Sequence, residues 1–137
     1  MYVEVTDVKK SYGEGGSYIQ VLKGVSVGVE KGKMCVIQGT SGSGKSTLMN
    51  MLGCLDVPTS GTYILNGRDV SSLSDNELSE VRNNEIGFIF QGFNLIPNLT
   101  AVENVELPLI YRKVDKSTRR RLAEEALEKV GLKERMK

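Results

Sequence analysis

Eight consecutive residues, Gly39 to Ser46, match the pattern G-x-x-x-x-G-K-[ST] at every fixed position. Glycine lets a backbone turn tightly and bring its N–H groups close to an anion, with no Cβ in the way. These N–H groups, together with the positive end of a helix that begins near Lys45, form a nest for a phosphate. The stretch therefore predicts a nucleoside triphosphate site.

The pattern also gives each side chain a role. Lys45 is expected to reach the β- and γ-phosphate oxygens as a point charge, while the Ser46 hydroxyl ligates Mg²⁺ and Thr47 supports it. A flexible Gly/Ser turn is the alternative, but only about 0.02 chance matches are expected in a chain of this composition. The residues expected to bind the nucleotide here are Gly39, Thr40, Ser41, Gly42, Ser43, Gly44, Lys45, Ser46 and Thr47.

The segments around this loop must position it. The continuous apolar run 34–37 predicts a buried strand, in which Cys35 is a buried thiol, and 45–53 predicts a helix that ends near Gly53. Ahead of them, residues 2–6 and 21–30 alternate between apolar and polar, which predicts two strands of an antiparallel β layer.

Further elements follow the loop. Residues 60–70 predict a short strand with a turn at Asn66-Gly67, and alternation over 85–91 predicts another strand. Two capping boxes, Ser74 with Glu77 and Thr100 with Glu103, mark helix starts. A last helix is expected over 115–131, with Ala123, Leu127 and Val130 on one face and Gly131 as its C-terminal cap.

Composition restricts the class of protein. Of 137 residues, 39% are hydrophobic and 26% charged, as in an ordinary globular protein, and the chain fits one domain or part of a larger one. Residues 112–137 contain 10 Lys+Arg against 5 Asp+Glu. A basic segment can contact nucleic acid or anionic lipid, but here the acidic residues interleave at helical spacing, which favours a solvated helix face. No nucleic-acid partner is expected.

The cysteines and the N-terminus indicate a cytosolic protein. Two cysteines and no histidine form neither a disulfide framework nor a metal pattern, which suggests a reducing compartment. The sequence MYVEVTDVKK lacks the apolar core of a signal peptide, and no stretch approaches the ~20 apolar residues of a membrane span.

The stretch SYGEGGSYIQVLKGVSVGVEKGKMCVIQGTSGSGKSTLMNMLGCLDVPTSGTYILNGRDV resembles the opening of an ABC transporter ATP-binding subunit. With IGFIFQGFNLIPNLTAVENVELPLIY, it is similar to the branch that serves macrolide export and lipoprotein release. The resemblance implies an α/β fold: a P-loop NTPase (ABC ATPase) core, truncated, with an N-terminal antiparallel β layer and the start of a helical subdomain. Residues 1–91 would form the N-terminal part of the nucleotide-binding core, and 92–137 the Q-loop and the start of the helical subdomain.

The resemblance also implies roles outside the loop. Tyr12 matches the aromatic residue that stacks on adenine, although a strand-end surface tyrosine is the alternative. Gln91 matches the Q-loop glutamine, whose amide oxygen joins the Mg²⁺ shell or orients the attacking water. The apolar run 92–100 either tucks into its own domain or docks onto the membrane subunit, and we favour docking. Thr40 and Gly92 depart from the Pro and Gln usual in close relatives, and Gly92 puts the coupling geometry after Gln91 in doubt.

The resemblance implies ATP and Mg²⁺ as ligands, a membrane-spanning permease and a second ATP-binding subunit as partners, and a peripheral place on the inner face of the cell membrane. In such a dimer, ATP hydrolysis would drive export or extraction of a substrate. The family's Leu-Ser-Gly-Gly-Gln signature, its strand ending in Asp-Glu (Walker B) and its switch histidine are absent from the 137 residues. We therefore interpret the chain as an N-terminal portion and expect it, alone, to bind Mg-ATP weakly or not at all and to hydrolyse it negligibly.

Two other interpretations remain. A GTPase also carries such a loop, but the Asn-Lys-x-Asp and Asp-x-x-Gly motifs of GTPases are missing. A small-molecule kinase usually begins almost directly with the strand before the loop, whereas nearly forty residues precede the loop here. A truncated, non-catalytic nucleotide-binding or interaction fragment is the second alternative.

Overall fold

The computed structural model describes residues 1–14 and 17–136. The chain divides into two compact units, Met1–Ile86 and Gly87–Lys137. The functional division expected after Gln91, into residues 1–91 and 92–137, stays a prediction.

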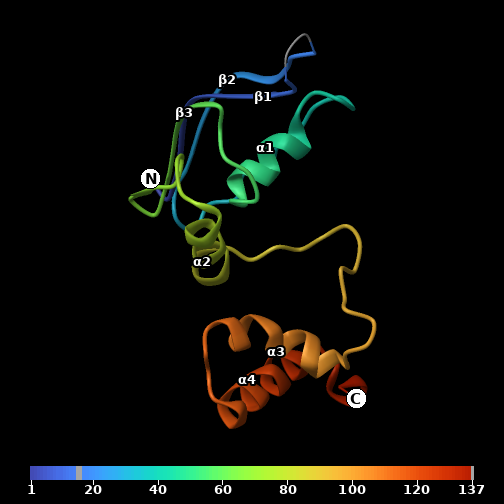
Figure 1. Cartoon of the computed structure of the whole chain (residues 1–137). Helices are drawn as coiled ribbons and strands as arrows, with labels where there is room; N and C mark the ends of the chain where they lie inside the picture. Colours follow the sequence, from blue (N-terminus) through green and yellow to red (C-terminus); the bar gives the residue numbers. More distant parts are fainter. Residues whose placement is uncertain (15–16, 137) are drawn as a thin grey trace. The chain divides into compact units, whose positions relative to one another are not determined.

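A four-stranded antiparallel sheet forms the framework of the first unit (Figure 1). Its strands are β1 (Val3–Tyr12), β2 (Ile19–Val29), β3 (Ser60–Leu65) and β4 (Arg68–Asp69), in the order β2-β1-β3-β4. The two early strands pair with each other, so the predicted antiparallel β layer is confirmed.

An irregularity in β1 changes which of its side chains face inward. The register shifts between Val5 and Val8 on the β2 side, and Asp7 between them has a left-handed φ of 46°. As a result Val5, Val8 and Lys10 are all buried, although a regular strand would turn residues 5 and 8 to opposite faces. The bulge therefore places a lysine at an inward-facing position.

The turn between β3 and β4 has the form that its residues predict. Asn66 and Gly67 both have positive φ, 48° and 80°, as a type I′ hairpin turn requires. The predicted Asn-Gly turn is confirmed.

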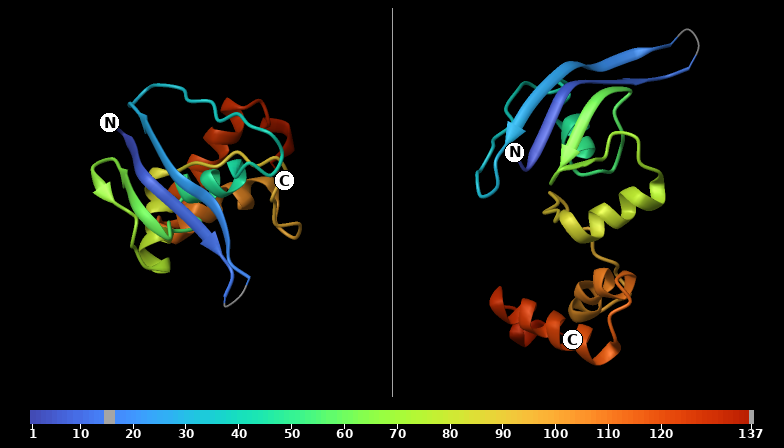
Figure 2. Two further views of the ribbon diagram at one scale, coloured as in Figure 1. Left: turned by 90° about the horizontal axis from the view of Figure 1, so that it is seen from above. Right: turned by 90° about the vertical axis from the view of Figure 1, so that its left-hand side faces the viewer.

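Two helices complete the core of the first unit, and α1 lies against one face of the sheet (Figure 2). Helix α1 (Lys45–Leu52) ends at Gly53 as predicted, and α2 (Asp75–Glu85) begins at the predicted capping box of Ser74 and Glu77. The sheet and both helices contribute to one apolar cluster, which consists of Val5, Val8, Leu22, Leu48, Met51, Cys54, Tyr63, Leu65, Val70, Leu78 and Val81.

The second unit is helical. Helix α3 (Ala101–Tyr111) begins at the capping box of Thr100 and Glu103, and α4 (Lys116–Lys129) begins at Asp115, with a short 3-10 turn, η1 (Lys133–Arg135), after it. Val102, Ala123 and Leu127 form its core. The last predicted helix is confirmed, with Gly131 just beyond its end at a φ of 76°. Val130, expected on the buried face, is instead exposed.

Two predicted strands, 34–37 and 85–91, are wrong. The first is extended coil in which Met34 is 91% exposed, and Cys35 is likewise exposed rather than buried. In the second, Glu85 closes α2 and the rest is coil, with Ile89 fully exposed. A strand becomes regular only through hydrogen bonds to a neighbour, and among the described residues neither segment pairs with one.

Candidate functional site

The loop from Gly39 to Gly44 curls around the ammonium group of Lys45. Lys45 Nζ donates to the carbonyl oxygens of Gly39, at 2.7 Å, and Thr40, at 2.6 Å, and lies 3.4 Å from Ser43 Oγ. A further hydrogen bond of 3.2 Å joins Ser43 N–H to Thr40 O. The structure thus brings the lysine of the motif onto the carbonyl oxygens of the loop that precedes it.

Two glycines of this loop avoid close contacts that a Cβ would make. Gly44 caps α1 with a left-handed φ of 94°, and a Cβ there would lie 3.0 Å from Leu22 Cδ2 and 3.3 Å from the Val21 carbonyl. A Cβ on Gly39 would lie only 2.6 Å from Ser43 Oγ, inside the curve of the loop. The loop is therefore packed against β2 on one side and closes tightly on itself on the other.

The N-terminus of α1 is suited to an anion. Its first intrahelical bond runs from Leu48 N–H to Gly44 O, so the N–H groups of the first turn have no partner within the helix. No side chain caps this end, and its first turn carries no acidic residue. Ser46, the predicted Mg²⁺ ligand, is exposed in this first turn, and Thr47 follows it half-buried.

The donor set around the loop fits a magnesium ion that is shared with phosphate. Among the described residues no three His, Cys, Asp or Glu side chains gather as a metal cage. Mg²⁺ commonly keeps water molecules and binds through one or two protein groups together with substrate phosphates. A hydroxyl such as that of Ser46 is consistent with this mode of binding.

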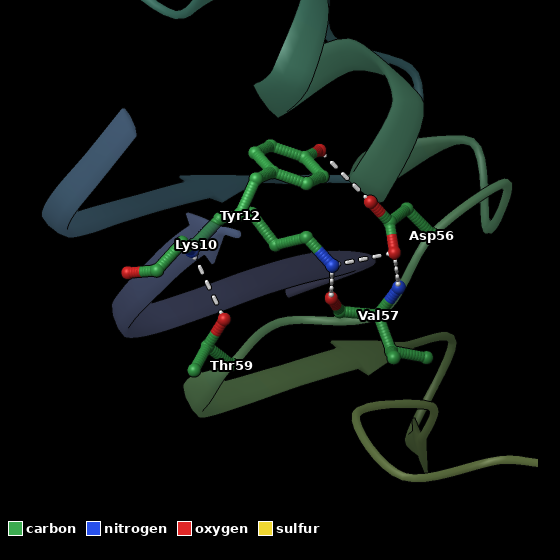
Figure 3. A network of polar contacts seen from close by, with 6 residues as sticks. Lys10, Tyr12, Asp56, Val57 and Thr59 are labelled. Atoms are coloured by element: carbon green, nitrogen blue, oxygen red, sulfur yellow. Dashed lines mark hydrogen bonds and ion pairs between the residues drawn. The ribbon is translucent and has the colours of Figure 1, made fainter. Parts of the chain in front are cut away.

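Tyr12, the predicted base-stacking residue, lies at the end of β1 and is 43% exposed. Figure 3 shows its hydroxyl pointing at Asp56, to which it donates a 2.9 Å hydrogen bond. Lys10 reaches the same carboxylate with a 2.6 Å ion pair and also donates to the Val57 carbonyl at 2.7 Å. The tyrosine is thus held by a polar network beneath it and is not a loose surface side chain.

The titration of this network follows from its contacts. Burial opposes ionisation of Asp56, but hydrogen bonds from Lys10, Tyr12 and the Val57 N–H prevail and lower its pKa. Burial and then the hydrogen bond to Asp56 raise the pKa of Tyr12, while a hydrogen bond with the Thr47 side chain acts in the opposite direction. Near neutral pH the pair is therefore a carboxylate that accepts from an intact phenol.

Gln91 and the apolar run after it belong to the second unit. Gln91 is exposed, and the structure does not place it relative to the phosphate loop. Phe93, Leu95 and Ile96 are exposed, whereas Leu99 is half-buried. The run is thus open to solvent, as a docking segment would be.

Sequence reasoning missed Lys10 and Asp56. They are 46 residues apart, so no local pattern joins them. One signal was available once the bulge in β1 was known: Lys10 then stands two residues after buried Val8, at an inward-facing position where a charge needs a partner.

A glycine loop that leads into a helix N-terminus, with its lysine on the loop, defines the class of P-loop nucleotide-binding proteins. Within this class the family is also shown: the family model described as ABC transporter matches residues 22–137. The chain belongs to the ABC transporter family.

Relatives and solved structures are consistent with this family. An uncharacterized ABC transporter ATP-binding protein of Bacillus subtilis, YvrO, is 54% identical over 96% of this chain and 58% of its own length. The macrolide export ATP-binding/permease protein MacB of Bdellovibrio bacteriovorus is 52% identical over 98% of the chain and 20% of its own length. A dimeric post-hydrolysis structure of the ATP-binding cassette MJ0796, bound to ADP and Pi, matches with a TM-score of 0.86 at 44% identity, over 98% of this chain and 59% of that one.

The predicted fold class is confirmed, since these neighbours are ABC ATPase cassettes of which the chain covers a part. The chain spans about 58% of the length of the ATP-binding relatives that it matches. Within the part of the chain that the structure describes, no helix has the length and apolar character to cross a membrane.

Proposed function

We propose that the chain is the phosphate-binding part of an ABC transporter ATP-binding subunit, and that it holds Mg-ATP through residues 39–47. The observation that carries this proposal is the Lys45 ammonium group on the loop carbonyls, directly before a helix N-terminus without an acidic side chain. In such a site the loop backbone and Lys45 bind the β- and γ-phosphates, and Tyr12 stacks on the base.

Mg²⁺ would be held by the Ser46 hydroxyl and the phosphates, with Gln91 as a further ligand, and would neutralise charge that develops on the γ-phosphate. Thr47, which is half-buried and follows Ser46, would support the turn that carries this hydroxyl. Gln91 would orient the attacking water as well.

Hydrolysis in the proposed subunit takes place in a dimer and drives export or extraction of a substrate by a membrane-spanning permease. Dimeric neighbours and MacB, whose name joins an ATP-binding part to a permease, support this proposal. The exposed Phe93, Leu95 and Ile96 would face the permease. The subunit would then lie on the cytoplasmic face of the cell membrane.

The second candidate function, a nucleotide-binding fragment that performs no ATP work, describes the 137 residues by themselves. They include no histidine, no Leu-Ser-Gly-Gly run and no apolar run that ends in Asp-Glu. Without these groups the transition state loses the electrostatic stabilisation that usually dominates catalysis. We expect weak binding of Mg-ATP and negligible turnover. Robust turnover that Lys45→Ala abolishes would contradict this.

The absence of tryptophan from the chain offers a direct test of binding. Tyr12→Trp introduces a single tryptophan at the proposed base site, whose fluorescence Mg-ATP should quench in a saturable way. Adding Lys45→Ala should shift this titration at least tenfold toward higher Mg-ATP, because a charged hydrogen bond to phosphate contributes about 1.5–3 kcal/mol. Lys31→Ala, which removes an exposed lysine in the turn after β2, is the matched control. Equal titrations with and without Lys45→Ala would refute the proposed site.

A further inference from the structure

We propose that Asp56 is a positioning residue for nucleotide binding, which holds the Tyr12 ring in the orientation that stacks on the base. This rests on the proposed function of the chain as an ATP-binding unit. Asp56 itself would not touch the nucleotide; it would act through the tyrosine.

The carboxylate of Asp56 is fixed from several sides. Its Oδ1 accepts from Lys10 Nζ at 2.6 Å and from the Val57 N–H at 2.8 Å, which leaves Oδ2 to accept from the Tyr12 hydroxyl at 2.9 Å. Lys10 is in turn held by the Val57 carbonyl. Because each oxygen has its own donor, the carboxylate cannot rotate without breaking a hydrogen bond, and its direction determines where the tyrosine hydroxyl lies.

The tyrosine ring is held at a second point. Lys10 Nζ lies over the ring, 5.0 Å from its centroid, at a distance where a cation attracts the face of an aromatic ring. Lys10 is only 9% exposed, whereas Tyr12 is 43% exposed. One part of the ring therefore rests on a buried lysine and a half-buried carboxylate, while the rest stays open to a ligand. A ring that is ordered before binding loses less conformational entropy when a base stacks on it.

The same hydroxyl is tied to the phosphate-binding helix. Its acceptor, Asp56, follows the end of α1, the helix that begins at Lys45. The contact with Asp56 thus links the tyrosine to the helix that begins at the proposed phosphate loop. This sets the spacing between the proposed base site and the proposed phosphate site.

The test distinguishes the contribution of the base to the binding affinity from the contribution of the phosphates. Mg-ATP and magnesium tripolyphosphate are titrated by calorimetry into the wild-type chain and into Tyr12→Phe, Asp56→Asn and Tyr12→Ala. Tyr12→Phe keeps the ring and the Lys10–Asp56 ion pair, so it should fold normally. We expect Tyr12→Phe and Asp56→Asn each to weaken Mg-ATP about fivefold, the effect of one hydrogen bond, and to leave tripolyphosphate unchanged. The double variant should lose no more than either single one.

Asp7 offers a matched control, because it lies on β1, the strand that carries Tyr12. Asp7 forms an exposed 3.4 Å ion pair with Lys9, so Asp7→Asn makes the same chemical change away from the tyrosine and should leave both affinities unchanged.

The other outcomes are distinct. If the wild type binds neither ligand, the proposed function itself fails. If Tyr12→Ala leaves the Mg-ATP affinity unchanged, Tyr12 does not belong to the site, and the positioning role of Asp56 is overturned while the phosphate-binding function stands. If Tyr12→Ala weakens Mg-ATP but Tyr12→Phe and Asp56→Asn do not, only the positioning role of Asp56 is overturned. Equal weakening of both ligands would mean that the network merely stabilises the fold, which also overturns the proposal.

Discussion

The Tyr63 hydroxyl donates a 2.8 Å hydrogen bond to the backbone carbonyl of Leu52, the last residue of α1. Tyr63 lies on β3 and is almost completely buried, and this burial raises the pKa of its hydroxyl. The C-terminal carbonyls of a helix have no partner within it, so this bond satisfies one of them with a group from the sheet. It joins the helix that begins at the phosphate loop to the β framework.

Removing this hydroxyl should loosen that connection. We expect Tyr63→Phe to lower the free energy of unfolding by about 1 kcal/mol, because a partly buried carbonyl loses its donor. Urea denaturation followed by circular dichroism measures this. Tyr18→Phe is the control, since Tyr18 is exposed. Equal stability of wild type and Tyr63→Phe would show that water replaces the bond.

The parts of the fold that the sequence predicted correctly depend on residues that lie close together in the sequence. In the capping box of α2, Ser74 N–H donates to Glu77 Oε2 at 2.9 Å, a contact between residues three apart that a short motif encodes completely. The Asn66-Gly67 turn is encoded in the same local way. The strand predicted at 34–37 is wrong because a strand needs a hydrogen-bonding partner from elsewhere in the chain, and an apolar run alone does not supply one.

The candidate site likewise has a part that neighbours in the sequence predict and a part that they do not. The loop from Gly39 to Ser46 could be predicted because its residues are contiguous and each has a steric or charge role. The contact of Tyr12 with Asp56 joins residues 44 apart and could not be predicted. It also depends on the β1 bulge, which turns Lys10 inward and has no local sequence signature as plain as a capping box.

Gly44 gives a second prediction, about the entrance to α1. Alanine there would adopt a left-handed φ and press its Cβ against Leu22, 3.0 Å away. We expect Gly44→Ala to lower the free energy of unfolding by about 2 kcal/mol, and Gly32→Ala by about 1 kcal/mol. Gly32 is the matched control because it also has a positive φ, of 77°, but a Cβ there would meet nothing within 4 Å. Equal losses in denaturant titrations would mean that Leu22 moves aside.

Asp115 gives a prediction about pH. It caps α4 by accepting from the Thr118 N–H at 3.0 Å, and hydrogen bonds from Ser117 and then Thr118 hold its pKa well below the usual range. A carboxyl whose pKa is lower in the folded state stabilises the fold above its unfolded pKa of about 3.9, and this contribution is lost as the pH falls further. The melting temperature should therefore fall more steeply below about pH 4 in wild type than in Asp115→Asn, which still caps the helix. Parallel curves would exclude Asp115 as a source of the acid sensitivity.

The two thiols give a last prediction, which checks the region before the phosphate loop. Cys35 is exposed, whereas Cys54 is 1% exposed and its burial raises the pKa of the thiol despite the nearby Arg82. The thiolate is the reactive form, so a chromogenic disulfide reagent at mildly alkaline pH should modify Cys35 rapidly and Cys54 only on unfolding. Cys35→Ser should abolish the fast phase, and Cys54→Ser should leave it intact. A Cys35 that reacts as slowly as Cys54 would instead indicate that residues 34–37 form the buried strand their apolar character suggests, paired with a segment outside the sheet of β1 to β4.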